Sequence, residues 1–175
     1  MEDAPDTTEP RWLDPDEQQQ WYAFAYVLIQ LPAALEARMQ HDAGIAHFEF
    51  VVLSTLSVAP ERTLRMSEVA QYAGSTLSRL SNVVIRLEKR GWVERRPDPS
   101  DGRATLATLT DDGMDTVTAA APSYVDAVRR LVFDPLTKAQ QRQLSAVSHR
   151  ILGALDAPCP TDLAPPGATP PADLG

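Results

Sequence analysis

A glycine between two short helical patterns is the feature that most constrains how this chain can fold. Residues 67–73 have the pattern of a short helix, and Gly74 follows it directly. Glycine adopts the positive φ that a tight connection between two helices requires. A second helix is expected over residues 76–90, with Ser75 as its cap and Gly91 at its end. Two helices joined through such a turn form a helix-turn-helix.

The second of these helices is amphipathic. Its apolar face is expected to pack against a core; it carries Leu77, Leu80, Val83, Val84 and Leu87. The opposite face is polar and basic; it carries Ser75, Ser78, Arg79, Asn82 and Arg86, with Thr76 beside them. Hydroxyl, amide and guanidinium groups on such a face either bind base edges and phosphates of nucleic acids or simply face solvent. We predict that these six residues contact DNA, through bases or phosphates.

A β-hairpin is expected directly after the two helices. Residues 92–96 alternate as a strand, residues 97–102 have the composition of a turn, and residues 104–109 alternate again. The predicted hairpin therefore has a long, charged tip. Asp101 in this tip is expected to form an ion pair that orients an arginine. Arg103 suits the negative potential of a narrow minor groove.

Positive charge is concentrated in one short segment of an acidic chain. The net charge of the whole chain is −8, yet residues 75–103 contain seven basic and four acidic side chains. Seven minus four is +3, which leaves −11 for the remainder of the chain. A local basic surface on an otherwise acidic protein is expected for a phosphate-binding face. Arg95 and Arg96, on the first strand of the hairpin, are therefore added to the predicted DNA contacts.

Further helices flank the helix-turn-helix and the hairpin on both sides. The expected ranges, from cap and periodicity signals, are about 14–40, 47–58, 111–132 and 138–155. Asp14, Thr110 and Thr137 are the expected caps of the first, third and fourth of these helices. Residues 64–66 are too short to classify alone and could form a brief edge strand. The proline-containing ends, residues 1–13 and 157–175, have the composition of disordered tails.

Several motifs follow one another in an order that a known family shows. They are Ser67-Glu68-Val69-Ala70, Arg86-Leu87-Glu88-Lys89-Arg90-Gly91-Trp92-Val93-Glu94-Arg95, Asp98-Pro99-Ser100-Asp101-Gly102-Arg103 and Leu109-Thr110-Asp111-Asp112-Gly113. Together they resemble the MarR (multiple antibiotic resistance) regulators, over about residues 14–156. The resemblance implies a mainly α (α+β) fold with a winged helix-turn-helix lobe at residues 45–110. Residues 14–44 and 111–156 are expected to form a helical dimerisation domain.

The same resemblance implies a function. The chain is expected to be a homodimeric regulator of transcription, most simply a repressor, that binds palindromic double-stranded DNA. The helix after Gly74 would enter the major groove, and the tip of the hairpin, the wing, would reach the minor groove. Relatives respond to small aromatic ligands. A pocket for such an effector is predicted at Trp21, Phe24, Tyr26, His47 and Phe48, although these residues could instead form core and dimer interface.

Other classes of function find little support in the sequence. His41 and His47 do not share one helix face, so no metal site is expected. No glycine-rich phosphate loop or nucleophile elbow occurs, so neither an enzyme nor a cofactor is expected. The chain has neither an apolar run of membrane-spanning length nor a signal peptide, which favours a cytoplasmic protein. A single cysteine, Cys159, excludes an internal disulfide. The main alternative is a winged-helix module that binds protein instead of DNA, and an enzyme on a helical scaffold is a second.

Overall fold

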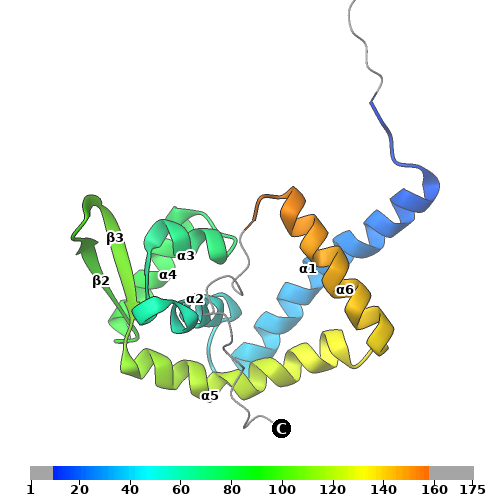
Figure 1. Cartoon of the computed structure of the whole chain (residues 1–175). Coiled ribbons are helices and arrows are strands. Elements are labelled where there is room, and N and C mark those ends of the chain that lie inside the picture. Colours follow the sequence, from blue (N-terminus) through cyan, green and yellow to red (C-terminus); the bar gives the residue numbers. More distant parts are fainter. Residues whose placement is uncertain (1–9, 158–175) are drawn as a thin grey trace, which may run out of the picture. The chain divides into compact units, whose positions relative to one another are not determined.

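The computed structural model describes residues 10–157, which are mainly helical with one small sheet (Figure 1). These residues form two compact units, which divide between Ala34 and Leu35. The helices are α1 (Pro15–Asp42), α2 (His47–Val58), α3 (Met66–Tyr72), α4 (Leu77–Lys89), α5 (Asp111–Val128) and α6 (Lys138–Ala154), with short helical turns η1 (Pro60–Arg62) and η2 (Arg129–Phe133). The strands are β1 (Thr63–Arg65), β2 (Val93–Asp98) and β3 (Asp101–Leu109). Cys159 and most of both predicted tails lie outside the described residues.

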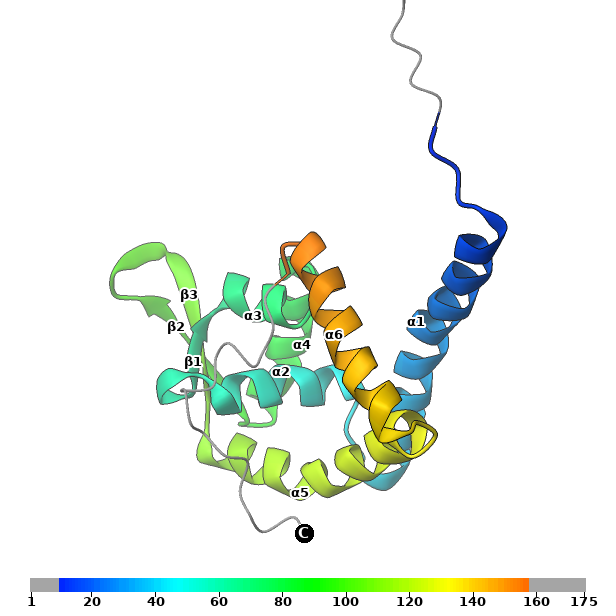
Figure 2. The same ribbon diagram turned by 45° about the vertical axis from the view of Figure 1, so that its right-hand side comes forward.

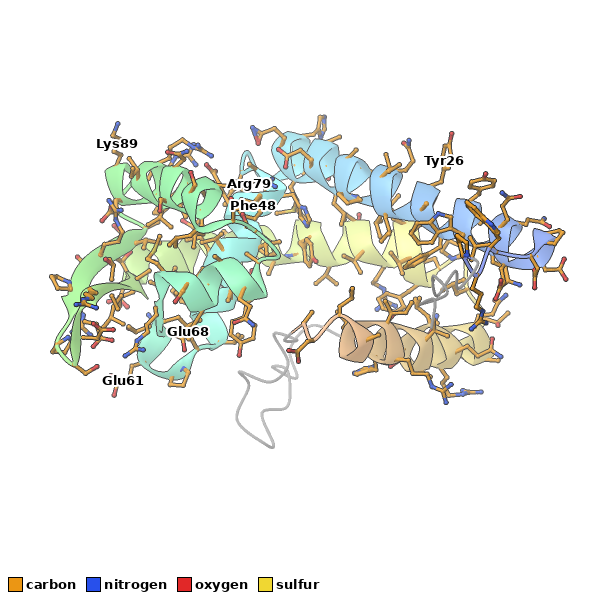
Figure 3. The ribbon with its side chains drawn as sticks, turned by 90° about the horizontal axis from the view of Figure 1, so that it is seen from above. Tyr26, Phe48, Glu61, Glu68, Arg79 and Lys89 are labelled. Atoms are coloured by element: carbon orange, nitrogen blue, oxygen red, sulfur yellow. The ribbon has the colours of Figure 1, made fainter. Side chains whose placement is uncertain are left out.

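A reciprocal pair of hydrogen bonds starts α1. The Glu17 backbone N–H donates to Asp14 Oδ1 at 2.8 Å, and the Asp14 N–H donates to Glu17 Oε2 at 3.0 Å. This arrangement is a capping box and confirms Asp14 as the predicted cap. The helix continues past Pro32 to Asp42, two residues further than expected. Its apolar side chains in the first unit are largely exposed, as Tyr26 illustrates at 66% (Figure 3).

One hydrophobic core fills the second unit. The helices α2 and α4 contribute the most side chains to it: Phe50, Val52, Leu53 and Leu56 from α2, and Leu80, Val83, Val84 and Leu87 from α4. The bounds of α2 are those predicted, and four of the five predicted core positions of α4 are buried. The exception is Leu77, which is 51% exposed. It is the first residue of α4, so its side chain lies at the end of the helix and beside the wing instead of over the core.

A Schellman turn joins α3 to α4. The backbone N–H of Gly74 donates to Gln71 O at 3.1 Å, and that of Ser75 donates to Ala70 O at 2.8 Å. Gly74 has a φ of +57°, the left-handed conformation predicted for this connection. Because Ser75 belongs to the end of α3, the predicted cap at Ser75 is wrong. Thr76 caps α4 instead, and its Oγ1 accepts from the Arg79 N–H at 3.2 Å.

The three strands form an antiparallel sheet in the order β1-β3-β2 (Figure 2). β2 and β3 extend further than expected, so the predicted six-residue tip is wrong. Asp98 faces Asp101 in the register, and only Pro99 and Ser100 lie between the strands. Pro97 can belong to β2 because β2 is an edge strand, where a missing N–H costs no ladder bond. The edge strand expected at residues 64–66 is present one residue earlier.

α5 begins against the base of the wing. Thr110 Oγ1 accepts from the Gly113 N–H at 3.0 Å, which caps the helix as the sequence predicted. The Thr110 N–H donates to Trp92 O at 3.1 Å and links α5 to the start of the hairpin. The helix ends at Val128, where the π-helical turn η2 begins, so the expected end near Val132 is wrong by one turn. Within residues 10–157, no helix is both long enough and apolar enough to cross a membrane.

Gly113 provides a test of this packing. A Cβ at this position would clash with the Trp92 carbonyl oxygen and lie 2.7 Å from Leu109 Cδ1. We expect Gly113→Ala to lower the free energy of unfolding by about 2–3 kcal/mol, because the wing base or α5 must shift. Gly153→Ala is the control, since a Cβ there meets nothing within 4 Å. Urea denaturation followed by circular dichroism measures both, and equal stability of the two variants contradicts the proposed clash.

Candidate nucleic-acid interface

The predicted polar face of α4 lies at the surface beside a shallow hollow. The hollow has a volume of about 570 Å³. Five of the six predicted DNA contacts around α4 line it: Thr76, Ser78, Arg79, Asn82 and Arg86. The other lining residues are Glu36 of α1, Ala46 before α2, Phe48 of α2 and Val83 of α4. Ser75 is not among them, and its hydroxyl donates to Thr76 O at 3.3 Å. The N-terminal half of α4 therefore presents hydroxyl, amide and guanidinium groups together.

Arg79 is held against an aromatic ring. Its Cζ lies 4.4 Å from the centroid of the Phe48 ring, from the neighbouring helix α2 (Figure 3). A guanidinium over a ring is attracted by the negative face of the π system, by about 0.5–1 kcal/mol at an exposed site. Arg79 as a whole stays exposed. Phe48, which was predicted to line an effector pocket, thus also orders a predicted DNA contact.

A buried carboxylate joins α2 to Arg86 of α4 and to Arg90, the residue that follows α4. Glu49 is only 4% exposed. Its Oε1 accepts from Arg86 Nε at 3.3 Å, and its Oε2 accepts from Arg90 Nη1 at 3.1 Å. The side chains of Arg86 and Arg90 are 55% and 44% exposed, so each guanidinium keeps solvent-facing N–H groups. The contacts of Glu49 with Arg86 and Arg90 were not predicted from the sequence. Glu49 is the only carboxylate in the mainly apolar helix α2, and this feature could have indicated a charged partner.

The arginines of the wing differ in how they are held. Arg95 forms an ion pair with Glu88 of α4, with Nη2 and Oε2 2.6 Å apart, and this contact ties β2 to α4. Arg96 on β2 and Arg103 on β3 are exposed, and no ion pair of either is present among the described residues. Arg95 and Arg103 both line a second hollow, of about 310 Å³, between the wing and α4. Leu77 and Ser81 of α4 line this second hollow too, so α4 borders both hollows.

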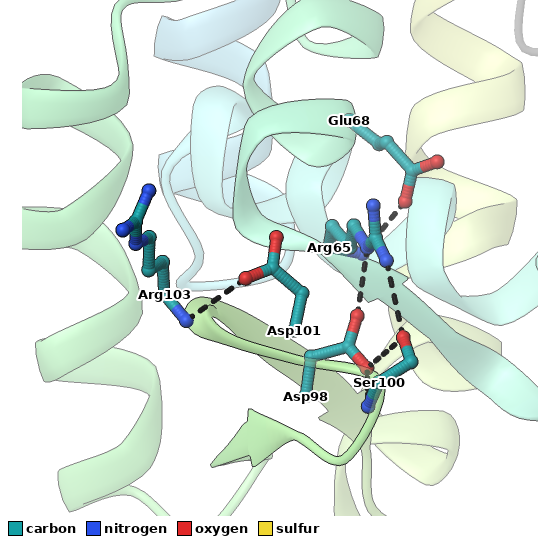
Figure 4. Close-up of polar contacts among 6 residues, drawn as sticks. All are labelled: Arg65, Glu68, Asp98, Ser100, Asp101 and Arg103. Atoms are coloured by element: carbon teal, nitrogen blue, oxygen red, sulfur yellow. Dashed lines mark hydrogen bonds and ion pairs between the residues drawn. The ribbon is translucent and has the colours of Figure 1, made fainter.

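The acidic residue that forms an ion pair in the wing is not the predicted one. Asp101 Oδ1 accepts a hydrogen bond from the Arg103 backbone N–H at 3.1 Å and forms no ion pair with an arginine side chain in the described structure. Asp98 takes that place, with Oδ2 2.8 Å from Arg65 Nε (Figure 4). Hydrogen bonds from Ser100, and then the Arg65 guanidinium, lower the pKa of Asp98 to about 2. This carboxylate is therefore ionised at neutral pH.

The residues of the predicted effector pocket are divided between the two units. In the first unit, the rings of Trp21 and Phe24 have centroids 6.4 Å apart, and Tyr26 is exposed. In the second unit, His47 stacks on Tyr124 with a centroid separation of 5.9 Å. Burial lowers the pKa of the His47 imidazole, while the nearby Glu36 carboxylate opposes this shift. The pocket stays a prediction.

Comparison with known proteins establishes the family. Residues 44–104 match the family model described as "MarR family". The structure of Sco3205, a MarR family transcriptional regulator from Streptomyces coelicolor in complex with DNA, is 44% identical to this chain. The similarity covers 85% of this chain and 92% of Sco3205, with a TM-score of 0.78. This chain belongs to the MarR family.

Further relatives agree with this assignment. AbsC, a MarR family transcriptional regulator from Streptomyces coelicolor, is 31% identical over 84% of this chain and 99% of AbsC, with a TM-score of 0.75. The transcriptional repressor MprA of Escherichia coli K12 is 28% identical over 119 residues, which are 68% of this chain and 67% of MprA. The resemblance and the winged-helix, mainly α fold predicted from the sequence are confirmed. Since the family consists of transcriptional regulators, this MarR protein is assigned to the regulation of transcription.

The carboxylate of Glu49 allows a direct test of how α4 is held. We expect Glu49→Gln to lower the free energy of unfolding by about 1–3 kcal/mol, because it removes the buried charge that forms ion pairs with Arg86 and Arg90. Asp115→Asn, an exposed position on α5, is the matched control and is expected to stay within about 0.5 kcal/mol of the wild type. Urea denaturation measures both. A Glu49→Gln protein as stable as the control would show that the contact contributes nothing.

Proposed function

We propose that this MarR protein is a homodimeric repressor that binds a palindromic DNA operator through α4 and the wing. The observation that carries the proposal is the exposed polar side of α4, which borders one hollow lined by its own predicted DNA contacts and a second hollow lined by Arg95 and Arg103 of the wing. The DNA complex of the similar protein Sco3205 supports it. Repression is proposed because MprA, a relative over two thirds of its length, is a transcriptional repressor.

The groups on α4 suit the major groove. Thr76, Ser78 and Asn82 offer short hydrogen-bonding side chains that can bind base edges or phosphates. Arg79, already ordered by Phe48, would make a guanidinium contact near them. Arg86 would bind a phosphate through the N–H groups that its contact with Glu49 leaves exposed. Ser75 lies in the turn before α4, and its proposed contact is a phosphate.

The wing arginines suit the DNA backbone and the minor groove. Arg103 beside the two-residue tip would enter a narrow minor groove, where the negative potential is largest. Arg96 on the neighbouring strand would bind a flanking phosphate, as would Arg95 from its ion pair with Glu88. Each phosphate neutralised in this way releases counterions, so binding should fall steeply with salt.

The apolar helices outside the winged lobe support a dimer. Residues 14–44 and 111–156 are proposed to form its interface. Large apolar side chains are exposed on α1 and α6 of the single chain, among them Trp21, Tyr22, Tyr26, Leu28 and Ile29 on α1 and Leu144, Val147, Ile151 and Leu155 just after or within α6. Exposed apolar surface of this extent marks an interaction site. A second copy of the chain offers the same surfaces and would bury them by two-fold symmetry.

Two-fold symmetry links the dimer to the operator and to an effector. Two lobes set about one helical turn apart, roughly 34–36 Å, would need a palindromic site. A small aromatic effector would release the DNA only if it bound more tightly to a dimer with a different lobe spacing. The aromatic residues of α1 and α2 named above are the proposed place for it.

The DNA proposal is tested by selecting duplexes from a randomised pool with the full-length protein and then measuring affinity by fluorescence anisotropy across a salt series. We expect a palindromic consensus and an affinity that falls steeply with salt. Arg103→Ala should weaken binding by roughly 5–150-fold, as for the loss of one groove contact of about 1–3 kcal/mol. Arg11→Ala removes the same charge outside the lobe and is the control. Absence of enrichment and of binding at low salt would favour the protein-binding alternative.

The dimer proposal is tested by sedimentation of the full-length protein. We expect twice the mass of the chain at micromolar concentration and a thermal midpoint that rises with protein concentration. Val147→Glu and Ile151→Glu place charge in the proposed interface and should shift the protein towards monomer. Ala146→Glu adds the same charge at an exposed position of α6 outside the stripe of Leu144, Val147 and Ile151, and is the control. A wild-type protein that sediments as a monomer at these concentrations contradicts the proposal.

A further inference from the structure

We propose that Arg65, Asp98 and Ser100 form a wing anchor that positions Arg103 for its contact with DNA. The inference rests on the proposed DNA-binding function and adds positioning residues to it. Within the anchor, Arg65 and Asp98 are assigned a role in DNA binding without touching DNA themselves.

The wing anchor is a closed set of hydrogen bonds (Figure 4). Arg65 Nε donates to Asp98 Oδ2 at 2.8 Å. The other carboxylate oxygen, Asp98 Oδ1, accepts from the Ser100 backbone N–H at 2.8 Å and from the Ser100 hydroxyl at 2.7 Å. Arg65 Nη2 also lies 3.3 Å from Ser100 Oγ. Asp98 is 6% exposed, so the charge-assisted bonds to it are shielded from water and strong.

The anchor connects parts of the sheet that the strand ladder leaves unconnected. In the order β1-β3-β2, β1 and β2 are not neighbours. β1 pairs only with residues 106–108 of β3, so the outer half of the wing is a ribbon of two strands. Such a ribbon is marginally stable by itself. The contact from Arg65 at the end of β1 to Asp98 at the end of β2 holds this outer half in place.

The far end of the anchor reaches the helix-turn-helix. Arg65 immediately precedes α3, and its backbone N–H donates to Glu68 Oε2 at 2.8 Å (Figure 4). The position of the wing turn is thereby linked to the first helix of the helix-turn-helix. Arg103 lies on β3, five residues beyond Asp98, and the Asp101 carboxylate holds its backbone N–H. We infer that the anchor sets the distance between Arg103 and α4, and hence between the two grooves that they would enter.

If Asp98 acted only through its charge, its neutralisation would change DNA affinity in the opposite direction from the change expected for a positioning residue. Asp98 is an ionised carboxylate in a segment that would approach a polyanion, so its neutralisation should strengthen binding if it has no other role. If it belongs to an anchor, neutralisation removes the ion pair with Arg65 and should weaken binding. The sign of the change therefore separates the two explanations.

The experiment compares Asp98→Asn with Glu94→Gln in the full-length protein, on the duplex that the selection described above yields. Glu94 is an exposed carboxylate on the same strand, so its loss changes charge without touching the anchor. We expect Asp98→Asn to weaken binding by about tenfold and Glu94→Gln to leave it equal or slightly tighter. Circular dichroism and the thermal midpoint establish that each variant is folded at the temperature of the titration. If the Asp98→Asn protein binds the duplex as tightly as the Glu94→Gln protein does, the proposed anchor is overturned.

A double-mutant cycle with Arg103→Ala measures the coupling between Asp98 and Arg103 in DNA affinity. A general structural defect would not produce this coupling. If the anchor acts through Arg103, the loss caused by Arg103→Ala should be smaller by about threefold or more in the Asp98→Asn background. Additive losses would overturn the inference even if Asp98→Asn weakens binding. A wild-type protein that binds no duplex would instead overturn the proposed function, and the inference with it.

Discussion

Burial of α2 is the constraint on which the rest of the winged lobe depends. Val52, Leu53 and Leu56 of this helix are fully buried, and apolar side chains occur around most of its circumference. A helix of this kind must be covered by several neighbours. α3, α5 and β3 pack against it, and α4 shares its core. The position of α4 is therefore determined by its packing in the core around α2, and this packing leaves the polar face of α4 exposed.

Glu49 introduces a charge into that apolar environment. Burying this charge costs free energy, but the contacts that satisfy it restrict the orientation of α4. A buried carboxylate is expensive unless charged partners meet it. Both partners, Arg86 in the last turn of α4 and Arg90 directly after it, come from the C-terminal end of this helix. The rotation of α4 about its axis is therefore linked to α2 by polar contacts as well as by packing. Apolar burial alone would tolerate small rotations of the helix, whereas two directional contacts on one carboxylate tolerate fewer.

Local sequence patterns predicted the elements well and the tertiary contacts poorly. The bounds of α2 and the caps Asp14, Thr110 and Thr137 follow from signals within a few residues, and the structure has them all. The ion pairs of Arg65, Arg86 and Arg90 join residues 33 to 41 positions apart, and periodicity carries no information about them. The choice between Asp98 and Asp101 as the ion-pairing residue depends on the strand register, which the turn composition left undetermined.

These contacts change how the charge count of the segment is interpreted. A net charge of +3 over residues 75–103 treats every arginine alike, yet Arg86 and Arg95 are already ordered by carboxylates, and Arg79 by an aromatic ring. A side chain ordered before binding loses less conformational entropy when it meets a phosphate. Acidic residues such as Glu49 and Glu88 therefore weaken the attraction to DNA at long range while lowering the entropic cost of contact. Such an arrangement favours a site with matching geometry over non-specific DNA, where attraction at long range contributes most.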